Sequence, residues 1–274
     1  MRLFQWERKG FYSLFAAALI VTTGITLGSC ATVGPSISLP EGDPSQIPAT
    51  EELVAGLAKR IDQIRSLRSL SFINYQNNDE RGGFRVALLV DRPDRLRLET
   101  LSPLGAILVL TANGDEVVGF LPRKRILYRG VSSKRNLFRF TQIPLELTEL
   151  TSLLLGLPPV KAEGPWKGED HAIHRSLPSG GSEWVVFDPA LGVPTRWDRL
   201  DSHGDTELSA VFSDFVSTTA GSFPLRILLE SGTEEKTWEI RYREPEVNVQ
   251  IPVPLFVQQR PSHVREISLE SIGG

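Results

Sequence analysis

The chain has 274 residues, of which 41% are hydrophobic and 23% are charged, and its formal net charge is −3. This composition is that of a folded globular protein, and the charge excludes general nucleic-acid binding, which needs a basic surface. Cys30 is the single cysteine, so an internal disulfide is excluded and the fold must be held by its core.

The first 29 residues have the three parts of an export signal. Arg2, Arg8 and Lys9 form a basic tip, a mostly apolar run covers residues 11–27, and small residues precede Cys30. The competing interpretation is an uncleaved transmembrane anchor, because the apolar run is near the shortest length that spans a bilayer. Threonines and a glycine inside the run weaken that alternative.

A tether and a helix are predicted next. Residues 30–49 contain four prolines and no hydrophobic period, which is typical of an extended spacer. An amphipathic helix is predicted over residues 51–67, with Thr50 as its N-cap. Its apolar stripe consists of Leu53, Leu57, Ile61 and Ile64.

From residue 70 the hydrophobic period changes from helical to two. Apolar residues alternate with charged or small ones over residues 84–91, 95–99 and 237–243, and turn-forming clusters separate the runs. This pattern predicts an antiparallel sandwich or barrel. Asn113-Gly114 predicts a hairpin turn, because both residues accept positive φ. The positions predicted to face inward are Phe84, Val86, Leu88, Leu96, Leu98, Trp238, Ile240 and Tyr242.

A short, leucine-rich helix is predicted over residues 144–156, ended by Gly156 and two following prolines. Beyond the N-terminal run, apolar stretches are too short to span a bilayer, so we expect anchoring to a membrane instead of threading through it.

The sequence lacks the common catalytic and metal-binding motifs. It has neither a Gly-x-Ser-x-Gly elbow nor a phosphate-binding Gly-Lys-Ser/Thr loop nor a His-Glu-x-x-His motif. His171 and His174 are three residues apart, and in a strand such side chains point to opposite faces. We therefore expect no enzymatic activity, no metal site and no cofactor.

A basic stretch with apolar residues woven into it lies between Val117 and Leu145, where no acidic residue occurs. Such a stretch can lie on an anionic lipid surface or on an acidic partner. The alternative is a solvated hairpin whose apolar residues face inward and whose charges face water. The basic residues are Arg123, Lys124, Arg125, Arg129, Lys134, Arg135 and Arg139.

Ser102-Pro103-Leu104-Gly105 forms a predicted turn after an alternating strand. Leu104 then lies at the turn tip, where a large aliphatic side chain has two possible fates. It folds back onto the core, or it stays exposed to insert into lipid or into a partner's groove.

The order of these features resembles the LolB family, outer-membrane lipoproteins that receive other lipoproteins from the periplasmic carrier LolA. Small residues directly before Cys30 resemble the lipobox, at which the signal is removed and the cysteine is acylated. In LolB a strand leads into an Asn/Ser-Pro-Leu-Gly turn whose protruding leucine is needed to place cargo in the membrane, and Leu104 falls on that position. Residues 223–230, 248–251 and Phe256 resemble the closing strands of LolA-like proteins. The Trp-rich segment of LolB after the mid-domain helix is not evident here.

The resemblance implies a mainly β (α+β) fold over residues 50–270. This fold is a curved, incompletely closed antiparallel β-barrel with an α-helical lid over an apolar cavity. It implies a monomer anchored by lipid at Cys30 to the periplasmic face of a Gram-negative outer membrane. The implied ligands are acyl chains, the implied donor is a LolA-like carrier, and cargo transfer would fall on Pro103, Leu104 and Gly105.

Two other functions stay open at this stage. The same fold can serve as an envelope lipid-binding or sensor module that reads acyl chains without moving cargo. It can also be a lipid-anchored structural interaction protein whose interior is filled by side chains.

Overall fold

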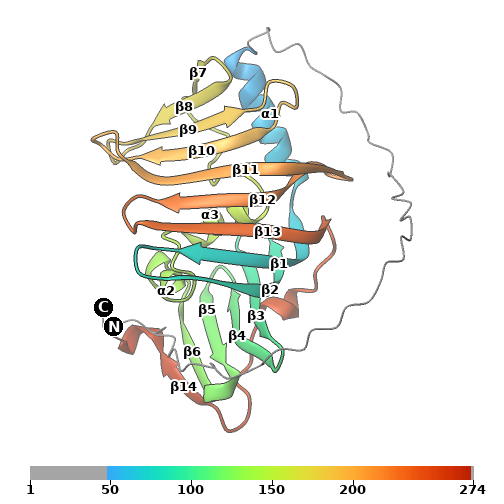
Figure 1. Cartoon of the computed structure of the whole chain (residues 1–274), viewed down its shortest axis with the longest axis vertical. Helices are drawn as coiled ribbons and strands as arrows, with labels where there is room; N and C mark the ends of the chain where they lie inside the picture. The colour runs from blue at the N-terminus through green and yellow to red at the C-terminus, as the bar shows by residue number, and fades with distance from the viewer. Residues whose placement is uncertain (1–47, 273–274) are drawn as a thin grey trace, which may run out of the picture. The chain divides into compact units, whose positions relative to one another are not determined.

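The computed structural model describes residues 48–272 (Figure 1). The predicted signal over residues 1–29, Cys30 and nearly all of the tether lie outside the described residues. The described part contains one sheet of fourteen strands with three α-helices and three short 3-10 helices.

The strands follow the order β14-β6-β5-β4-β3-β2-β1-β13-β12-β11-β10-β9-β8-β7. Neighbours pair antiparallel, except that β14 runs parallel to β6. β7 and β14 lie at the two ends and do not pair with each other, so the sheet is not closed. The bounds are β1 Ser66–Gln76, β2 Arg81–Asp91, β3 Arg95–Ser102, β4 Gly105–Ala112, β5 Glu116–Leu121, β6 Ile126–Val131, β7 Lys167–Glu169, β8 Ala172–Ser176, β9 Ser182–Phe187, β10 Pro194–Leu200, β11 Thr206–Thr218, β12 Gly221–Ser231, β13 Lys236–Val247 and β14 Arg265–Ser268.

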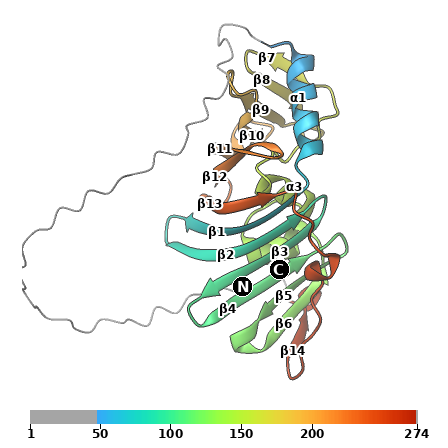
Figure 2. The same ribbon diagram turned by 90° about the vertical axis from the view of Figure 1, so that its right-hand side faces the viewer.

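The helices are α1 Thr50–Gln63, α2 Lys134–Thr141 and α3 Leu147–Leu154, and the 3-10 helices are η1 Pro122–Lys124, η2 Val253–Phe256 and η3 Leu269–Ser271. Figure 1 looks at the outer face of the sheet, with the three α-helices behind it on the inner face. Figure 2 shows α1 alongside β7 to β10. The predicted fold class, a mainly β, curved and incompletely closed antiparallel barrel with an α-helical lid, is confirmed.

The register of the central strands sets which side chains share the inner face. Ser71 of β1 pairs with Val86 on one side and with Tyr242 on the other. Because directly opposite residues point to the same face, these strands present one continuous row inward. The same pairing joins Ile73 to Phe84 and to Ile240, so the row spans β2, β1 and β13.

Helix α1 differs from its predicted bounds. It begins at Thr50 with Ala49 as N-cap, and no side chain caps it. It ends at Gln63, and Leu67, predicted to be helical, is a buried residue of β1 paired with Val90. The predicted N-cap and C-terminal end were therefore wrong. Pairing with β2 and β13 satisfies this backbone better than another helical turn would, since strand partners are available on both sides.

Two other local predictions also need correction. The hairpin between β4 and β5 lies where it was predicted, but neither Asn113 nor Gly114 has a positive φ. Instead, Oδ1 of Asn113 accepts hydrogen bonds from the backbone N–H groups of Asp115 and Glu116, each at 3.1 Å, which is how an Asx turn is held. The leucine-rich helix is shorter than predicted, because a capping box between Glu146 and Glu149 starts it.

Candidate functional site

The turn between β3 and β4 presents Leu104 to solvent. Its side chain is 85% exposed, the highest value among the exposed large hydrophobic residues of the described part. Gly105 has φ +101°, a conformation that other residues rarely adopt. Oγ of Ser102 accepts a hydrogen bond from the N–H of Leu104 at 3.2 Å and donates one to the carbonyl of Gly105 at 2.8 Å. The local hydrogen bonds therefore hold the leucine outward at the tip.

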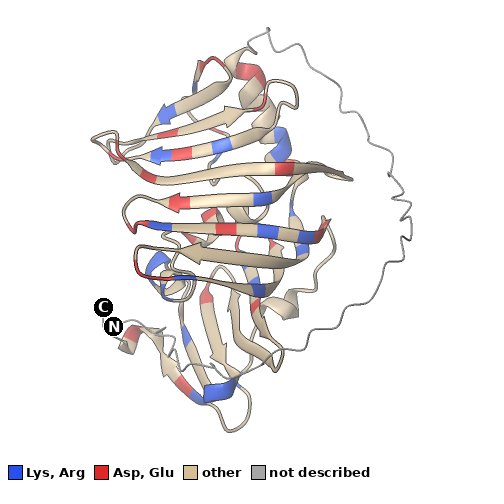
Figure 3. Ribbon diagram, viewed as in Figure 1, with Lys and Arg blue, Asp and Glu red and all other residues tan. Residues whose placement is uncertain are grey.

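A basic turn lies beside this tip. Nη2 of Arg123, in η1 between β5 and β6, donates a hydrogen bond to Oγ of Ser102 at 3.0 Å. Lys124 and Arg125 follow Arg123, and all three side chains are exposed. Figure 3 shows η1 as a basic segment where β5 meets β6. We call Leu104 together with Arg123, Lys124 and Arg125 the tip surface.

The remaining residues of the basic stretch lie elsewhere. Arg129 is half-buried and forms ion pairs with Glu116 and with Glu266, the latter at 3.1 Å. Lys134 and Arg135 are exposed at the start of α2, after the end of β6 that is opposite to η1. The structure thus does not bring the predicted basic residues into one surface. The alternative, a hairpin, is present as β5 and β6, with Arg123, Lys124 and Arg125 exposed at its turn, and α2 follows it.

The eight positions predicted to line a cavity all lie on the inner face. Phe84 and Leu98 are half-buried, and the other six are at most 6% exposed. Tyr242 shows what covers them: its phenol donates a hydrogen bond to the carbonyl of Leu154 in α3 at 2.8 Å. Burial raises the pKa of Tyr242 well above its usual value. Six of these side chains are therefore buried in the structure, and α3 covers Tyr242.

Farther along the inner face, toward β8 to β10, lies an ionic cluster that the sequence analysis did not anticipate. Glu183 is 2% exposed and accepts hydrogen bonds from Arg175 at 2.8 Å and from Arg199 at 2.9 Å. Arg199 also donates to Glu149 of α3 at 2.6 Å. Each buried charge is paired, which makes burial tolerable. This cluster fastens α3 to β9 and β10, and it makes this part of the inner face polar.

Arg60 is a further residue that the sequence analysis missed. It lies on the buried side of α1 with Leu53, Leu57 and Ile64, whereas the predicted Ile61 is only half-buried. The Arg60 side chain is 8% exposed, and its Nε and Nη2 have no hydrogen-bond partner among the described residues. A signal was present, since residue 60 follows Leu57 by three positions and therefore shares its side of a helix.

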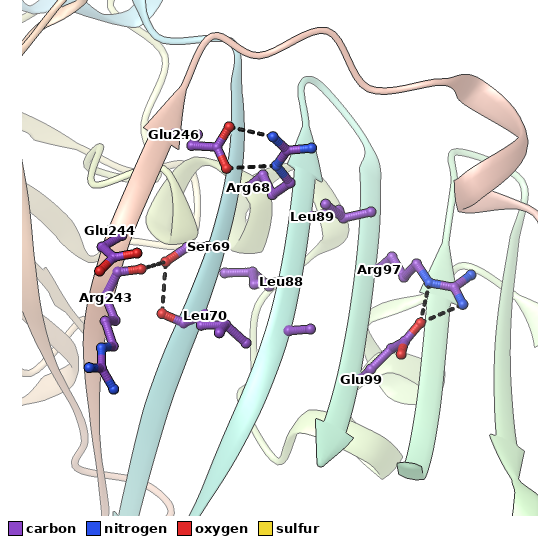
Figure 4. A pocket seen from close by; sticks show the side chains of 11 residues that line it. Arg68, Ser69, Leu70, Leu88, Leu89, Arg97, Glu99, Arg243, Glu244 and Glu246 are labelled. Carbon is purple, nitrogen blue, oxygen red and sulfur yellow. Dashed lines mark hydrogen bonds and ion pairs between the residues drawn. The ribbon is translucent and has the colours of Figure 1, made fainter. Parts of the chain in front are cut away.

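A groove of about 570 Å³ lies on the outer face, and Figure 4 shows its lining. Leu70 of β1 lies in it and is 54% exposed. Two of its arginines are paired, Arg68 with Glu246 and Arg97 with Glu99. Opposite charges held in this way leave the groove with little net attraction for a charged ligand.

Within residues 48–272, no group of three or more His, Cys, Asp and Glu side chains is placed to hold a metal ion. None of the helices in that range has the length and apolar character needed to cross a membrane.

Comparison with known proteins gives structural matches only. No family model matches the chain, and no curated protein matches it. A domain from Vibrio parahaemolyticus, named for outer membrane lipoprotein sorting, is 13% identical with a TM-score of 0.56, and the match covers 76% of this chain and 97% of that one. A DUF1329 family protein from Desulfovibrio piger is 11% identical with a TM-score of 0.53, over 75% of this chain and 97% of that one.

A LolA superfamily protein from Nitrosomonas europaea matches more weakly, at 13% identity and a TM-score of 0.47 over 77% of this chain and 98% of that one. Identities this low show the fold and do not single out a LolB-like member. The chain has the fold of the Vibrio lipoprotein-sorting domain.

Proposed function

We propose that this protein is a lipid-anchored outer-membrane lipoprotein that binds acyl chains and inserts other lipoproteins into the membrane, as LolB does. The observation that carries the proposal is the tip surface, in which an 85%-exposed leucine stands beside three exposed basic residues. A soluble domain gains nothing from presenting Leu104 to water, whereas a bilayer offers the leucine an apolar environment and the basic residues an anionic surface.

The magnitudes favour membrane contact. Burying a leucine side chain contributes up to about 3 kcal/mol, and each basic residue near an anionic surface adds about 1 kcal/mol. Neither term alone holds a protein on a membrane firmly. The two together suit a tip that enters the bilayer briefly while the lipid on Cys30 supplies the lasting anchor.

Binding of an acyl chain to the inner face requires the helical lid to move. Because six of the eight predicted inner-face side chains are buried, a chain can reach them only when α3 or a neighbouring element moves away. The Tyr242–Leu154 hydrogen bond and the Arg199–Glu149 ion pair are the contacts that such a movement would break. We expect a LolA-like carrier to deliver the cargo to this inner face and the protein to act without catalysis or cofactor.

The test measures transfer and stability on one variant. Leu104→Glu should abolish transfer of a lipoprotein into liposomes by the full-length protein, because a charged tip resists entry into hydrocarbon. It should change the free energy of unfolding by about 0.5 kcal/mol or less, as surface substitutions do. Val253→Glu is the matched control, since Val253 is 50% exposed in η2, which belongs to a different segment. A large loss of stability, or undiminished transfer, would overturn the insertion role.

The close cover of the inner face also supports a second candidate function, that of a structural interaction lipoprotein. This cover is fastened by the ionic cluster, and it suits a protein whose interior is filled. Mass spectrometry of the protein purified without its signal and with Cys30 replaced decides between the two. A co-purified lipid supports acyl-chain binding, and lipid-free protein that stays lipid-free on incubation with fatty acids supports the structural role.

A further inference from the structure

Arg60 is a buried cation that the proposed mechanism does not yet use. It lies between Leu57 and Ile64 on the buried side of α1, and both neighbours are at most 1% exposed. The arginine itself is 8% exposed, with Nε and Nη2 unpartnered within the described part. A charged group in such a position is normally paired or hydrogen-bonded, because leaving water uncompensated is costly.

The charge on Arg60 is uncompensated as well as buried. Burial alone lowers the pKa of Arg60, to about 10, with no opposing contribution from a neighbouring carboxylate. The guanidinium nevertheless stays charged at neutral pH, since this pKa is still far above 7. The site therefore carries a permanent positive charge beside the buried side chains of Leu57 and Ile64.

Arg92, a second arginine near α1, differs from Arg60 in its hydrogen-bond partners. Its Nη1 donates a hydrogen bond to the carbonyl of Ile61, at the last turn of α1, where carbonyls carry partial negative charge. Asp62 also raises the pKa of Arg92 against the effect of burial. Arg92 thus has a partner for its Nη1 in α1, although its Nε has none among the described residues. Arg60, on the buried side of the same helix, has no partner for either Nε or Nη2.

We propose that Arg60 is the counter-ion for an anionic group at the polar end of the acyl-chain ligand. This inference rests on the proposed function, because it assumes that the space under α1 receives a lipid. A planar guanidinium offers a forked pair of donors that matches a carboxylate or a phosphate. The ligand class is accordingly a fatty acid or an acidic phospholipid. A neutral lipid with the same chain would leave the charge uncompensated and would bind more weakly.

The experiment uses photoreactive lipids of one chain length, in neutral phosphatidylcholine vesicles that carry the full-length protein. The probes are a fatty acid, the phosphatidic acid and the neutral fatty alcohol, and the reading is the probe concentration at half-maximal cross-linking. The variants are Arg60→Leu, Arg60→Lys and Lys59→Leu. Lys59 is the matched control, because it is the adjacent cation on the exposed side of α1.

Wild type and Lys59→Leu should bind an anionic probe about tenfold or more tightly than the alcohol, which is the effect of one hydrogen-bonded charge pair. Arg60→Leu should bind acid and alcohol alike, and Arg60→Lys should keep part of the preference. A stronger preference for the fatty acid identifies a carboxylate, and one for phosphatidic acid identifies a phosphate. Equal binding of acid and alcohol by wild type would overturn the role of Arg60 and leave acyl-chain binding intact. If no probe labels any variant, the proposed function itself fails.

The thermal midpoints of the Arg60 variants, measured with and without fatty acid, distinguish a ligand-binding arginine from one that stabilises the fold. Without lipid, the thermal midpoint of Arg60→Leu should equal or exceed that of wild type, because replacing an unpaired buried charge by an apolar side chain removes a cost. Added fatty acid should raise the midpoint of wild type and leave that of Arg60→Leu nearly unchanged. A clear drop in the lipid-free midpoint of both Arg60→Leu and Arg60→Lys would show that the arginine serves the fold instead.

Discussion

The phenol of Tyr242 donates a hydrogen bond to the backbone carbonyl of Leu154 across 2.8 Å, joining two residues that are 88 positions apart in the chain. Tyr242 belongs to β13 in the middle of the sheet, and Leu154 is the last residue of α3. The bond is buried, and it connects the lid directly to the inner face.

Removing this bond should loosen the lid. Tyr242→Phe keeps the ring and leaves the carbonyl of Leu154 without its partner, so the free energy of unfolding should fall by about 1–3 kcal/mol. Chemical denaturation measures this change, and hydrogen exchange should show faster opening of α3. Tyr75→Phe is the control, because Tyr75 is a half-buried tyrosine of β1. If both variants lose equal stability, the Tyr242 bond has no special part in holding α3.

The basic part of the tip surface should act through charge. Arg123→Ala should weaken binding to vesicles of anionic lipid about fivefold at low salt, since one arginine near such a surface contributes about 1 kcal/mol. The loss should shrink as ionic strength rises. Arg135→Ala removes an exposed arginine after the opposite end of β6 and should have a smaller effect. If both variants weaken vesicle binding equally, the effect comes from overall charge and the tip surface is not the part that contacts the membrane.

A carboxylate on the outer face makes stability depend on acid pH. Hydrogen bonds from Arg241, Asn74 and Arg226 hold the pKa of Glu239 at about 2, below its ordinary value of 4.5. A group whose pKa is depressed by folding stabilises the protein above its unfolded pKa, and the contribution is lost as the pH falls toward the folded pKa. The stability difference between wild type and Glu239→Gln should therefore be constant above about pH 5 and shrink between pH 4.5 and 2. Urea denaturation at several pH values measures it, and a difference as large at pH 2.5 as at pH 7 would contradict the pairing.

Lipidation at Cys30 remains a prediction from the sequence. Cells that express the wild-type chain should incorporate labelled palmitate into the processed protein, and Cys30→Ala should remain unprocessed and unlabelled. The reason is that Cys30 has the only thiol in the chain, and the diacylglyceryl group that precedes cleavage at the predicted lipobox must be attached to a thiol. A wild-type protein that takes up no label, or a Cys30→Ala protein that is processed normally, would contradict this.

Much of the sheet could be predicted because its side chains alternate clearly. In β2 and β3, Val86, Leu88 and Leu96 face inward as their period of two requires. The turn at Leu104 was equally readable, because Pro103 and Gly105 restrict the backbone around it. Both features depend on a few neighbouring residues, which is the range in which sequence patterns are informative.

The features that were missed depend on contacts distant in sequence. Helix α2 was not predicted, although Ser133 caps it by accepting a hydrogen bond from the N–H of Asn136. The charged and apolar residues of α2 alternate in a way that fits an edge strand as well as a short helix. Arg60 was overlooked because arginine is usually exposed, and periodicity did not show that Ile61 would be less buried than Arg60. The cluster around Glu183 brings together residues of β8, β9, β10 and α3, which no local pattern reveals.

Because the sheet is open, its edge strands affect whether molecules of the protein associate with one another. A sheet that never closes leaves two strands with unpaired backbone groups, and such edges invite pairing between molecules. Here both edges are short: β7 spans three residues and β14 spans four. Each also carries charge, with Lys167 and Glu169 on β7 and Arg265 and Glu266 on β14. Copies of the protein at high local concentration would thus find little unpaired backbone to pair with, so the short, charged ends of the sheet limit edge-to-edge aggregation.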